Sequence, residues 1–279
     1  MAMQDCLAQL DLGLARARYG AWLGAVKPKL GTECWQLKDL RHPLLVWQER
    51  QEAGTAVVPV SLQIEPPLRV VAITGPNTGG KTVTLKSLGL ATLMARTGLF
   101  LPCSGTPQLP WCEAVLADIG DEQSLQQNLS TFSGHVRRIA RILEALSSLG
   151  AEPVPALVLL DEVGAGTDPS EGAALATALL RYLADQVQLS VATTHFGELK
   201  ALKYDDSRFE NASVEFDEVS LRPTYRLLWG IPGRSNALAV ARRLGLSEAV
   251  LGGAEQLLDE QGTSSVNTVI SGLEEQRQR

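Results

Sequence analysis

The sequence predicts an α/β protein whose core sheet is mainly parallel. Three continuous apolar runs, at residues 68–74, 157–160 and 189–194, are separated by stretches with helical periodicity. Runs of this kind are typical of parallel strands that are covered on both faces. The first run leads into a glycine-rich stretch and then into a helical pattern, and this order of strand, turn and helix belongs to the same fold class.

The first two dozen residues predict one helix with an apolar seam. Steps of four and three residues connect the members of the seam, which are Met3, Leu7, Leu10, Leu14, Ala17 and Ala21. Such a seam more often packs on its own domain than on another chain. Because no capping residue precedes it, we expect residues 1–30 to be the remnant of a longer upstream helical region.

One antiparallel strand and three helices are predicted next. The alternating apolar positions that indicate a half-buried strand are Val58, Val60, Leu62 and Ile64. The helical stretches that follow a Gly, Ser or Thr start signal are 80–95, 134–149 and 171–186.

The last part of the chain has a different pattern. Residues 211–216 and 224–230 predict a hairpin, and residues 236–244 and 248–260 predict two short helices. Residues 261–279 are polar with weak periodicity, so no structure is assigned to them.

Composition restricts the classes of function. The chain has 25 Lys and Arg against 31 Asp and Glu, and a formal charge of −6 gives no general attraction for a polyphosphate backbone. Two arginine-bearing stretches, 136–143 and 240–246, are interpreted first as solvated helix faces. The four cysteines have no metal-ligand spacing, and no signal peptide or long apolar run is found. We therefore expect reduced thiols, a cytoplasmic location and no membrane partner.

A phosphate-binding loop is predicted directly after the first apolar run. The chain there matches G-x-x-x-x-G-K-[ST] between a strand and a helix, and the residues are Gly75, Pro76, Asn77, Thr78, Gly79, Gly80, Lys81 and Thr82. Backbone N–H groups and the helix N-terminus would hold the β- and γ-phosphates, Lys81 would add a charge, and Thr82 would place its hydroxyl on Mg²⁺. The alternative is a glycine-rich turn without a ligand.

Two carboxylates follow the second apolar run. Asp161 would hold Mg²⁺ through its water shell, and Glu162 would orient or deprotonate an attacking water. The alternative for both is a helix-capping or surface role. His195 follows the third run, at the edge where open α/β sheets bind ligands, and is interpreted as a γ-phosphate sensor rather than a structural histidine.

The chain resembles the ATPase domain of the MutS family in five segments that occur in the family's order. They are TGPNTGGKT, DIGDEQSLQQNLSTFSGH, LVLLDEVGAGTDPSEG, ATTHF and GRSNALAVARRLGL. The resemblance runs from about residue 41 to about residue 260 and is greatest to the second bacterial branch, the MutS-two or endonuclease MutS type. It implies an ABC-type P-loop ATPase that works as a dimer, and we expect residues 31–260 to form this domain.

The resemblance also implies that two subunits share each site. Ser130, with Thr131, matches the signature loop that reaches the γ-phosphate bound by the partner subunit, which gives Ser130 a catalytic role beside Glu162 and His195. Locally, a plain helix N-cap is an equally good interpretation of Ser130. The loop after the acidic strand matches one that crosses the dimer interface. The expected interface residues are Ser130, Thr131, Gly166, Thr167 and Asp168.

Further partners are implied by the resemblance alone. MutS proteins carry a helical lever and clamp before this domain, and the MutS-two type usually carries a small nuclease domain after it; neither fits in 279 residues. We expect a homodimer through the ATPase face and contact with branched or mismatched DNA through domains outside this chain. The ribosome is a further expected partner, since the branch is also associated with collided ribosomes. Residues 261–279 are then a polar tail or the start of a linker.

Four functions remain open on the sequence. The first is Mg²⁺-dependent ATP hydrolysis at two composite sites, as the motor and clamp of a DNA-binding protein that restrains recombination. The second is a nucleotide-dependent dimerisation module with negligible turnover in isolation. The third is a small-molecule kinase, for which the sequence offers no acceptor pocket or arginine-bearing lid. The fourth is a mismatch-repair ATPase domain. ATP rather than GTP rests mainly on the resemblance.

Overall fold

The structure is a computed structural model of the chain. It describes residues 2–51, 56–75, 80–120, 131–150, 153–217, 222–231, 233 and 237–260. The helices are α1 (Ala2–Leu23), α2 (Pro43–Gln51), α3 (Lys81–Arg96), α4 (Thr131–Leu149), α5 (Pro169–Gln186), α6 (Glu198–Asp205), α7 (Ala237–Arg243) and α8 (Glu248–Glu260). The strands are β1 (Lys29–Leu30), β2 (Trp35–Leu40), β3 (Val60–Ile64), β4 (Val70–Thr74), β5 (Ser104–Leu109), β6 (Ala114–Asp118), β7 (Val154–Leu160), β8 (Val187–Thr193), β9 (Phe209–Asp217) and β10 (Arg222–Trp229).

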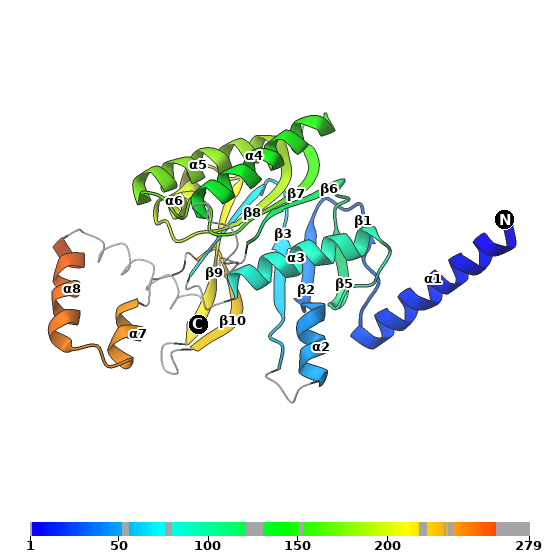
Figure 1. Cartoon of the computed structure of the whole chain (residues 1–279), viewed down its shortest axis with the longest axis horizontal. Helices are drawn as coiled ribbons and strands as arrows, with labels where there is room; N and C mark the ends of the chain where they lie inside the picture. The colour runs from blue at the N-terminus through cyan, green and yellow to red at the C-terminus, as the bar shows by residue number, and fades with distance from the viewer. Residues whose placement is uncertain are drawn as a thin grey trace.

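The strands form two sheets with α3 between them (Figure 1). The larger sheet has the order β10-β9-β4-β8-β7-β6, and its neighbouring strands are parallel except for the β9–β10 hairpin. The smaller sheet has the order β1-β5-β2-β3, in which β2 is antiparallel to both neighbours. The predicted α/β class, with a mainly parallel core sheet and an antiparallel portion, is confirmed.

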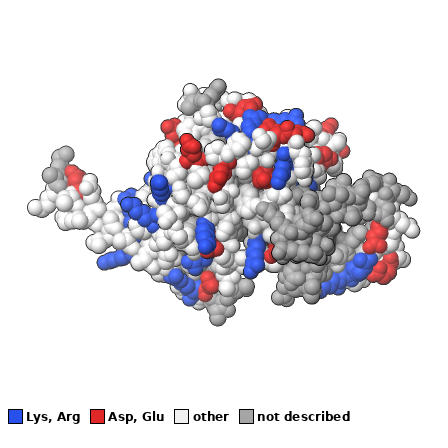
Figure 2. All heavy atoms as spheres, turned by 180° about the vertical axis from the view of Figure 1, so that it is seen from behind, with Lys and Arg blue, Asp and Glu red and all other residues white. Residues whose placement is uncertain are grey.

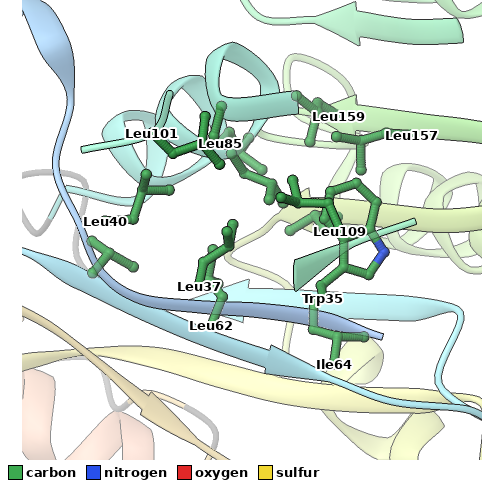
Figure 3. Close-up of a cluster of buried hydrophobic side chains, with 14 of the residues drawn as sticks. Trp35, Leu37, Leu40, Leu62, Ile64, Leu85, Leu101, Leu109, Leu157 and Leu159 are labelled. Atoms are coloured by element: carbon green, nitrogen blue, oxygen red, sulfur yellow. The ribbon is translucent and has the colours of Figure 1, made fainter. Parts of the chain in front are cut away.

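Helix α3 packs into a core that joins the two sheets. Figure 3 shows Trp35, Leu37 and Leu62 of the smaller sheet on one side of this core, with Leu85 of α3 and Leu157 of β7 opposite. All five side chains are buried. The smaller sheet is therefore part of the same folding unit as the parallel sheet.

Helices α4, α5 and α6 cover the other face of the larger sheet and form a second core (Figure 1). In β7, Leu157 and Leu159 point into the first core, whereas Val158 and Leu160 point into the second. Successive side chains of a strand alternate between faces, so a strand that is covered on both faces has no polar positions. This arrangement explains the continuous apolar runs of the sequence.

Helix α1 confirms the predicted helix, and most of its seam is exposed. Met3, Leu7, Leu10 and Leu14 are 79%, 60%, 59% and 55% exposed, and the first turns of α1 extend away from the sheets (Figure 1). The helix reaches the core only at its end, through Leu23. The first four members of the seam therefore do not pack on the described part of this domain, and the expectation of a remnant of an upstream helical region stays a prediction.

The charged surface has no large field of one sign on the face seen in Figure 2. Basic and acidic side chains are interspersed there, with basic ones more frequent toward α1. In the two arginine-bearing stretches, Arg138 is ion-paired with Asp118, and Arg242 is ion-paired with Glu248 and Glu255. Within the described ranges, no helix is long and apolar enough to cross a membrane.

Candidate nucleotide site

The predicted site residues converge because three neighbouring strands end at one edge of the larger sheet. Gly75 follows β4, Asp161 and Glu162 follow β7, and His195 follows β8. Strand β8 lies between β4 and β7, and all three are parallel. Their carboxyl ends therefore meet, at the position where open α/β sheets bind ligands.

The phosphate-binding loop is described at both of its ends. Gly75 has φ +124°, and Gly80 has φ +89° directly before α3 begins at Lys81. Both values lie in the region that favours glycine. Pro76, Asn77, Thr78 and Gly79 lie outside the described residues, so their predicted role stays a prediction.

Lys81, the first residue of α3, is almost fully buried, with 2% of its surface exposed. Its ammonium group donates a hydrogen bond to the Gly75 carbonyl and lies 3.2 Å from His195 Nε2. Burial lowers the pKa of Lys81 to about 8, while the nearby charges of Glu162 and Asp161 act in the opposite direction. The ammonium group at the N-terminus of α3 is the part of this arrangement that fits an anionic ligand, because a helix N-terminus also favours negative charge.

Thr82 and Asp161 lie in direct contact. The Thr82 hydroxyl donates to Asp161 Oδ2 at 2.8 Å, and the Thr193 hydroxyl donates to Asp161 Oδ1 at 2.5 Å. Thr193 also accepts a hydrogen bond from the Glu162 backbone N–H at 2.8 Å. A hydroxyl and a carboxylate side by side form an oxygen donor set that suits Mg²⁺, which usually takes one or two protein ligands beside phosphates and waters. The residues present therefore fit the ion that the resemblance implies.

Lys81, Asp161 and Thr193 form the buried floor of the site. Glu162 and His195 are more accessible than these three residues. Glu162 has φ +50°, a backbone conformation that residues other than glycine rarely adopt, and its side chain is 25% exposed. His195 Nε2 lies 3.6 Å from Glu162 Oε1, and its side chain is 46% exposed. The pKa of His195 is lowered, first by burial and then by the Lys81 charge, with Glu162 and Asp161 opposing. Water and a nucleotide can reach both side chains.

The loop after Glu162 is held in a defined conformation. Gly164 has φ +81°, and a Cβ atom there would lie 2.4 Å from the Gly172 carbonyl oxygen and 2.9 Å from the Phe196 ring. Asp168 caps α5 by accepting hydrogen bonds from the N–H groups of Ser170 and Glu171. Gly166 and Asp168 are exposed and Thr167 is half-buried, so a partner could reach them, and their predicted interface role stays a prediction.

The signature loop is described only at its end. Ser130 lies outside the described residues. Thr131 is the first residue of α4, but its side chain is not described either. The helix was predicted to begin at residue 134, and its earlier start places Ser133 inside it rather than before it. The roles of Ser130 and Thr131 therefore stay predictions.

Sequence reasoning missed a buried cluster that ties α4 to the site. Asp118, which ends β6 and is 2% exposed, accepts a hydrogen bond from Arg138 Nε, and His135 Nδ1 lies 2.7 Å from its other carboxylate oxygen. Its backbone carbonyl accepts from the Asp161 N–H at 2.8 Å. The interpretation of residues 136–143 as a purely solvated face is therefore wrong for Arg138.

Tyr225 is a second contact that the sequence did not indicate. A Cβ atom on Gly80 would lie 3.0 Å from the Tyr225 ring, which is 44% exposed. Tyr225 has φ +62° and lies where the β9–β10 register shifts, between Pro223 and Leu227. The hairpin pattern in the sequence predicts that side chains alternate between the two faces, but it does not predict a bulge. The contact between Tyr225 and the phosphate loop is therefore visible only in the structure.

Comparison with known proteins agrees with this geometry. Residues 71–261 match the family model of MutS domain V. The chain is 62% identical to an endonuclease MutS2 of Synechocystis sp., over 96% of this chain and 34% of that protein. It is 48% identical to an endonuclease MutS2 of Shouchella clausii, over 97% of this chain and 33% of that protein. It is 47% identical to an endonuclease MutS2 of Exiguobacterium sibiricum, over 99% of this chain and 33% of that protein.

The chain thus spans about a third of the length of these relatives. The family match covers most of the chain and includes the ends of the phosphate-binding loop, the acidic strand end and His195. MutS domain V is a P-loop ATPase domain, and that fold is the one described above. The chain belongs to the MutS family through this domain, and within the family it is most similar to the MutS2 proteins.

Proposed function

We propose that this chain binds ATP with Mg²⁺ and hydrolyses it at composite sites of a homodimer. The observation that carries the proposal is the convergence of Lys81, Thr82, Asp161, Glu162 and His195 at the ends of three adjacent strands. Phosphoryl transfer to water needs little covalent chemistry from the protein, so charge and positioning are what a site must supply. This cluster supplies both.

Each residue has a task that its surroundings support. Lys81 would exchange the Gly75 carbonyl for a phosphate oxygen, because an anion is a stronger partner for an ammonium group than a neutral carbonyl is. Thr82 and Asp161 would hold Mg²⁺, which supplies positive charge to the phosphates when bound. Glu162 would orient the attacking water and accept its proton, and His195, beside both Glu162 and Lys81, would contact the γ-phosphate.

The Tyr225 ring is the best-placed aromatic surface for a base. It lies against Gly80 and remains 44% exposed, so one part of it can meet a ligand while another part packs on the loop. Stacking on an aromatic ring does not distinguish adenine from guanine, and the choice of ATP follows the family.

The second subunit would complete each site. Ser130 and Thr131 of the partner copy would reach the γ-phosphate, with Gly166, Thr167 and Asp168 in the contact between subunits. The exposure of Gly166 and Asp168 supports this arrangement. The cluster of Asp118, His135 and Arg138 supports it further, because it fixes the start of α4 to the strand next to Asp161.

The whole protein would use this domain as a nucleotide-driven clamp. We propose that residues 31–260 form the ATPase domain, since β2 and β3 share a core with α3. Residues 1–30, of which Leu23 and β1 pack on this domain, and residues 261–279 would lead to further parts. The relatives are named endonucleases, and contact with branched or mismatched DNA would lie in parts beyond this chain. The ribosome as a partner and a cytoplasmic location rest on the resemblance alone.

The test is ATP turnover per molecule over a wide range of protein concentrations. Turnover should rise with concentration, should fall in Ser130→Ala, and should fall by about 10² to 10⁴ in Glu162→Gln, the usual contribution of such a group. Ser147→Ala is the matched control, because its hydroxyl only donates to the Leu143 carbonyl within α4.

Other outcomes would select another function. Turnover that is constant with concentration and unchanged by Ser130→Ala would contradict the shared site and favour a self-contained P-loop enzyme. ATP-dependent dimerisation without turnover would favour a binding module.

A further inference from the structure

A short segment after β10 is attached to the phosphate loop at its base. It consists of Gly230, Ile231 and Gly233, and is called here the anchor segment. The Gly233 N–H donates to the Thr74 hydroxyl at 2.7 Å, and the Gly230 N–H donates to the Asn211 carbonyl at 2.7 Å. Ile231 is 5% exposed. The segment is therefore fixed by hydrogen bonds and burial, although it has no regular secondary structure.

Gly233 packs directly on the first residue of the phosphate loop. A Cβ atom on Gly233 would lie 3.0 Å from both Cα and N of Gly75, and 3.1 Å from the Thr74 carbonyl carbon. Only a residue without a side chain fits there, so the two backbones are in contact. A shift of Gly75 along this direction must push Gly233.

Helix α6 also holds the anchor segment. The Lys200 ammonium donates to the Gly233 carbonyl at 2.7 Å, and the Lys203 ammonium donates to the Gly230 carbonyl at 3.3 Å. The Asn211 side-chain amide donates to the Lys200 carbonyl at 2.8 Å, which ties the helix back to β9. Hydrogen bonds from a charged donor are about twice as strong as neutral ones.

We propose that Lys200 is a positioning residue that couples the nucleotide site to helices α7 and α8. The proposal rests on the ATP site proposed above. Gly233 is in backbone contact with Gly75 and its carbonyl accepts a hydrogen bond from Lys200, so a movement of either element is passed to Gly233. Lys200 lies on α6, which begins three residues after His195, so the γ-phosphate end of the site is connected to the same carbonyl.

The connection to α7 is short. Helix α7 begins at Ala237, four residues beyond Gly233, and four residues reach about 14 Å at most. Helix α7 and its neighbour α8 lie apart from both sheets (Figure 1). The position of Gly233 therefore limits where these two helices can lie, and that position depends on the site through the Gly75 contact and the Lys200 hydrogen bond together.

The test is hydrogen exchange of α7 and α8 with and without a non-hydrolysable ATP analogue and Mg²⁺, together with the affinity for that analogue. In the unchanged chain the analogue should alter amide exchange in residues 237–260 by about fivefold or more, the lower end of typical coupling free energies. In Lys200→Met, which keeps the aliphatic stem, this response should disappear while the affinity changes by less than about threefold. Lys200→Arg should restore it, because the guanidinium also donates to carbonyls.

Two further variants separate coupling from a general loss of structure. Lys29→Met removes an exposed lysine on β1 and should leave the response unchanged. Gly233→Ala forces residue 233 away from Gly75 and should also remove the response, although the Lys200 side chain itself is kept.

The outcomes are distinguishable. A normal response in Lys200→Met, or no response in the unchanged chain despite binding, would overturn the coupling and leave the ATP site intact. Loss of analogue binding in a folded Lys200→Met would assign Lys200 to the site itself and also overturn it. Failure of the unchanged chain to bind the analogue would overturn the proposed function, and the coupling with it.

Discussion

The floor of the proposed nucleotide site buries polar side chains, whereas helix α1 exposes apolar ones, and both differ from the usual distribution. In the floor, Lys81, Asp161 and Thr193 are polar and at most 6% exposed, whereas in α1 the apolar Leu7 and Leu10 are about 60% exposed. Buried polar groups cost stability unless they are hydrogen-bonded, and exposed apolar groups in a row gain nothing from their own chain. The buried polar groups of the floor are hydrogen-bonded to one another, as the proposed site requires, whereas the exposed seam of α1 buries little apolar surface on the described fold.

The largest effect is expected where the loop above the floor is packed most tightly. Gly164→Ala should lower the free energy of unfolding by about 3 kcal/mol, because the new Cβ meets the Gly172 carbonyl at 2.4 Å and φ is +81°. Gly245→Ala is the matched control, with φ +87° and no atom within 4 Å, and should cost about 1 kcal/mol. Chemical denaturation measures both. Equal costs would show that conformation, not packing, determines the requirement at Gly164.

Removal of one hydroxyl from the floor should cost less. Thr193→Val keeps the shape but leaves Asp161 without one donor and the Glu162 N–H without its acceptor, so unfolding should become easier by about 2 kcal/mol. Affinity for ATP with Mg²⁺ should fall as well. Thr92→Val, whose hydroxyl donates only to the Leu88 carbonyl within α3, should leave that affinity unchanged. An unchanged Thr193→Val protein would show that the hydroxyl does not hold Asp161.

A smaller effect is expected at the exposed end of the loop. Hydrogen bonds, first from the Ser170 side chain and then from backbone N–H groups, lower the pKa of Asp168. Asp168→Ala should therefore lower the thermal midpoint at neutral pH by less than Thr193→Val does. Because the folded pKa lies below the unfolded one, the contribution is present above the unfolded pKa and is lost as pH falls through the folded value. Thermal unfolding from neutral to acidic pH should show the variant and the original chain converging, and Asp168→Ser should keep part of the cap.

The smallest effect is expected in the seam. Leu7→Gln should change the free energy of unfolding by no more than about 0.5 kcal/mol, as is usual for exposed positions. Leu85→Ala, in the core between the sheets, should cost several times more, about 2 to 5 kcal/mol. Chemical denaturation compares them directly. A loss above about 1 kcal/mol in Leu7→Gln would mean that the seam is buried in solution.

The sequence was a good guide wherever local pattern and local structure coincide. The helix predicted at 171–186 is α5, which begins at Pro169 behind its Asp168 cap, and the two short helices near the end are found within one residue of their predicted bounds. The strand predicted from Val58 to Ile64 begins only at Val60, because Val60 is the first residue paired with β2. Apolar periodicity thus gave the type of each long element but not its ends.

Elements whose pattern is weak were missed. Strand β5 has the sequence SGTPQL, which shows no apolar alternation, and α6 is only eight residues long. Strand β2 ends at Leu40 and helix α2 begins at Pro43, and neither was predicted. Short elements are stabilised mainly by the surfaces that they pack on. Those surfaces come from distant parts of the chain, so the local sequence does not reveal them.

The site could be predicted in its parts but not in its connections. Lys81, Asp161 and His195 came from motifs, and the structure brings them together as expected. Thr193 and Asp118 were not predicted. Their partners are distant in the chain, so only the order of strands in the sheet shows which polar side chains meet.

That strand order also governs when the site can form as the chain is made. Strand β4, which carries the phosphate loop, is central in the sheet, and both of its neighbours come much later in the chain. Val70 is aligned with Ser190 on one side and with Phe209 on the other. Contacts between distant segments form slowly, because a long loop must close first. A nascent chain that has reached the glycine-rich loop therefore lacks both neighbours of the strand that supports it. The proposed nucleotide site therefore needs β4, β7 and β8 together, and we expect ATP to stabilise this domain only after His195, late in the chain, has been made.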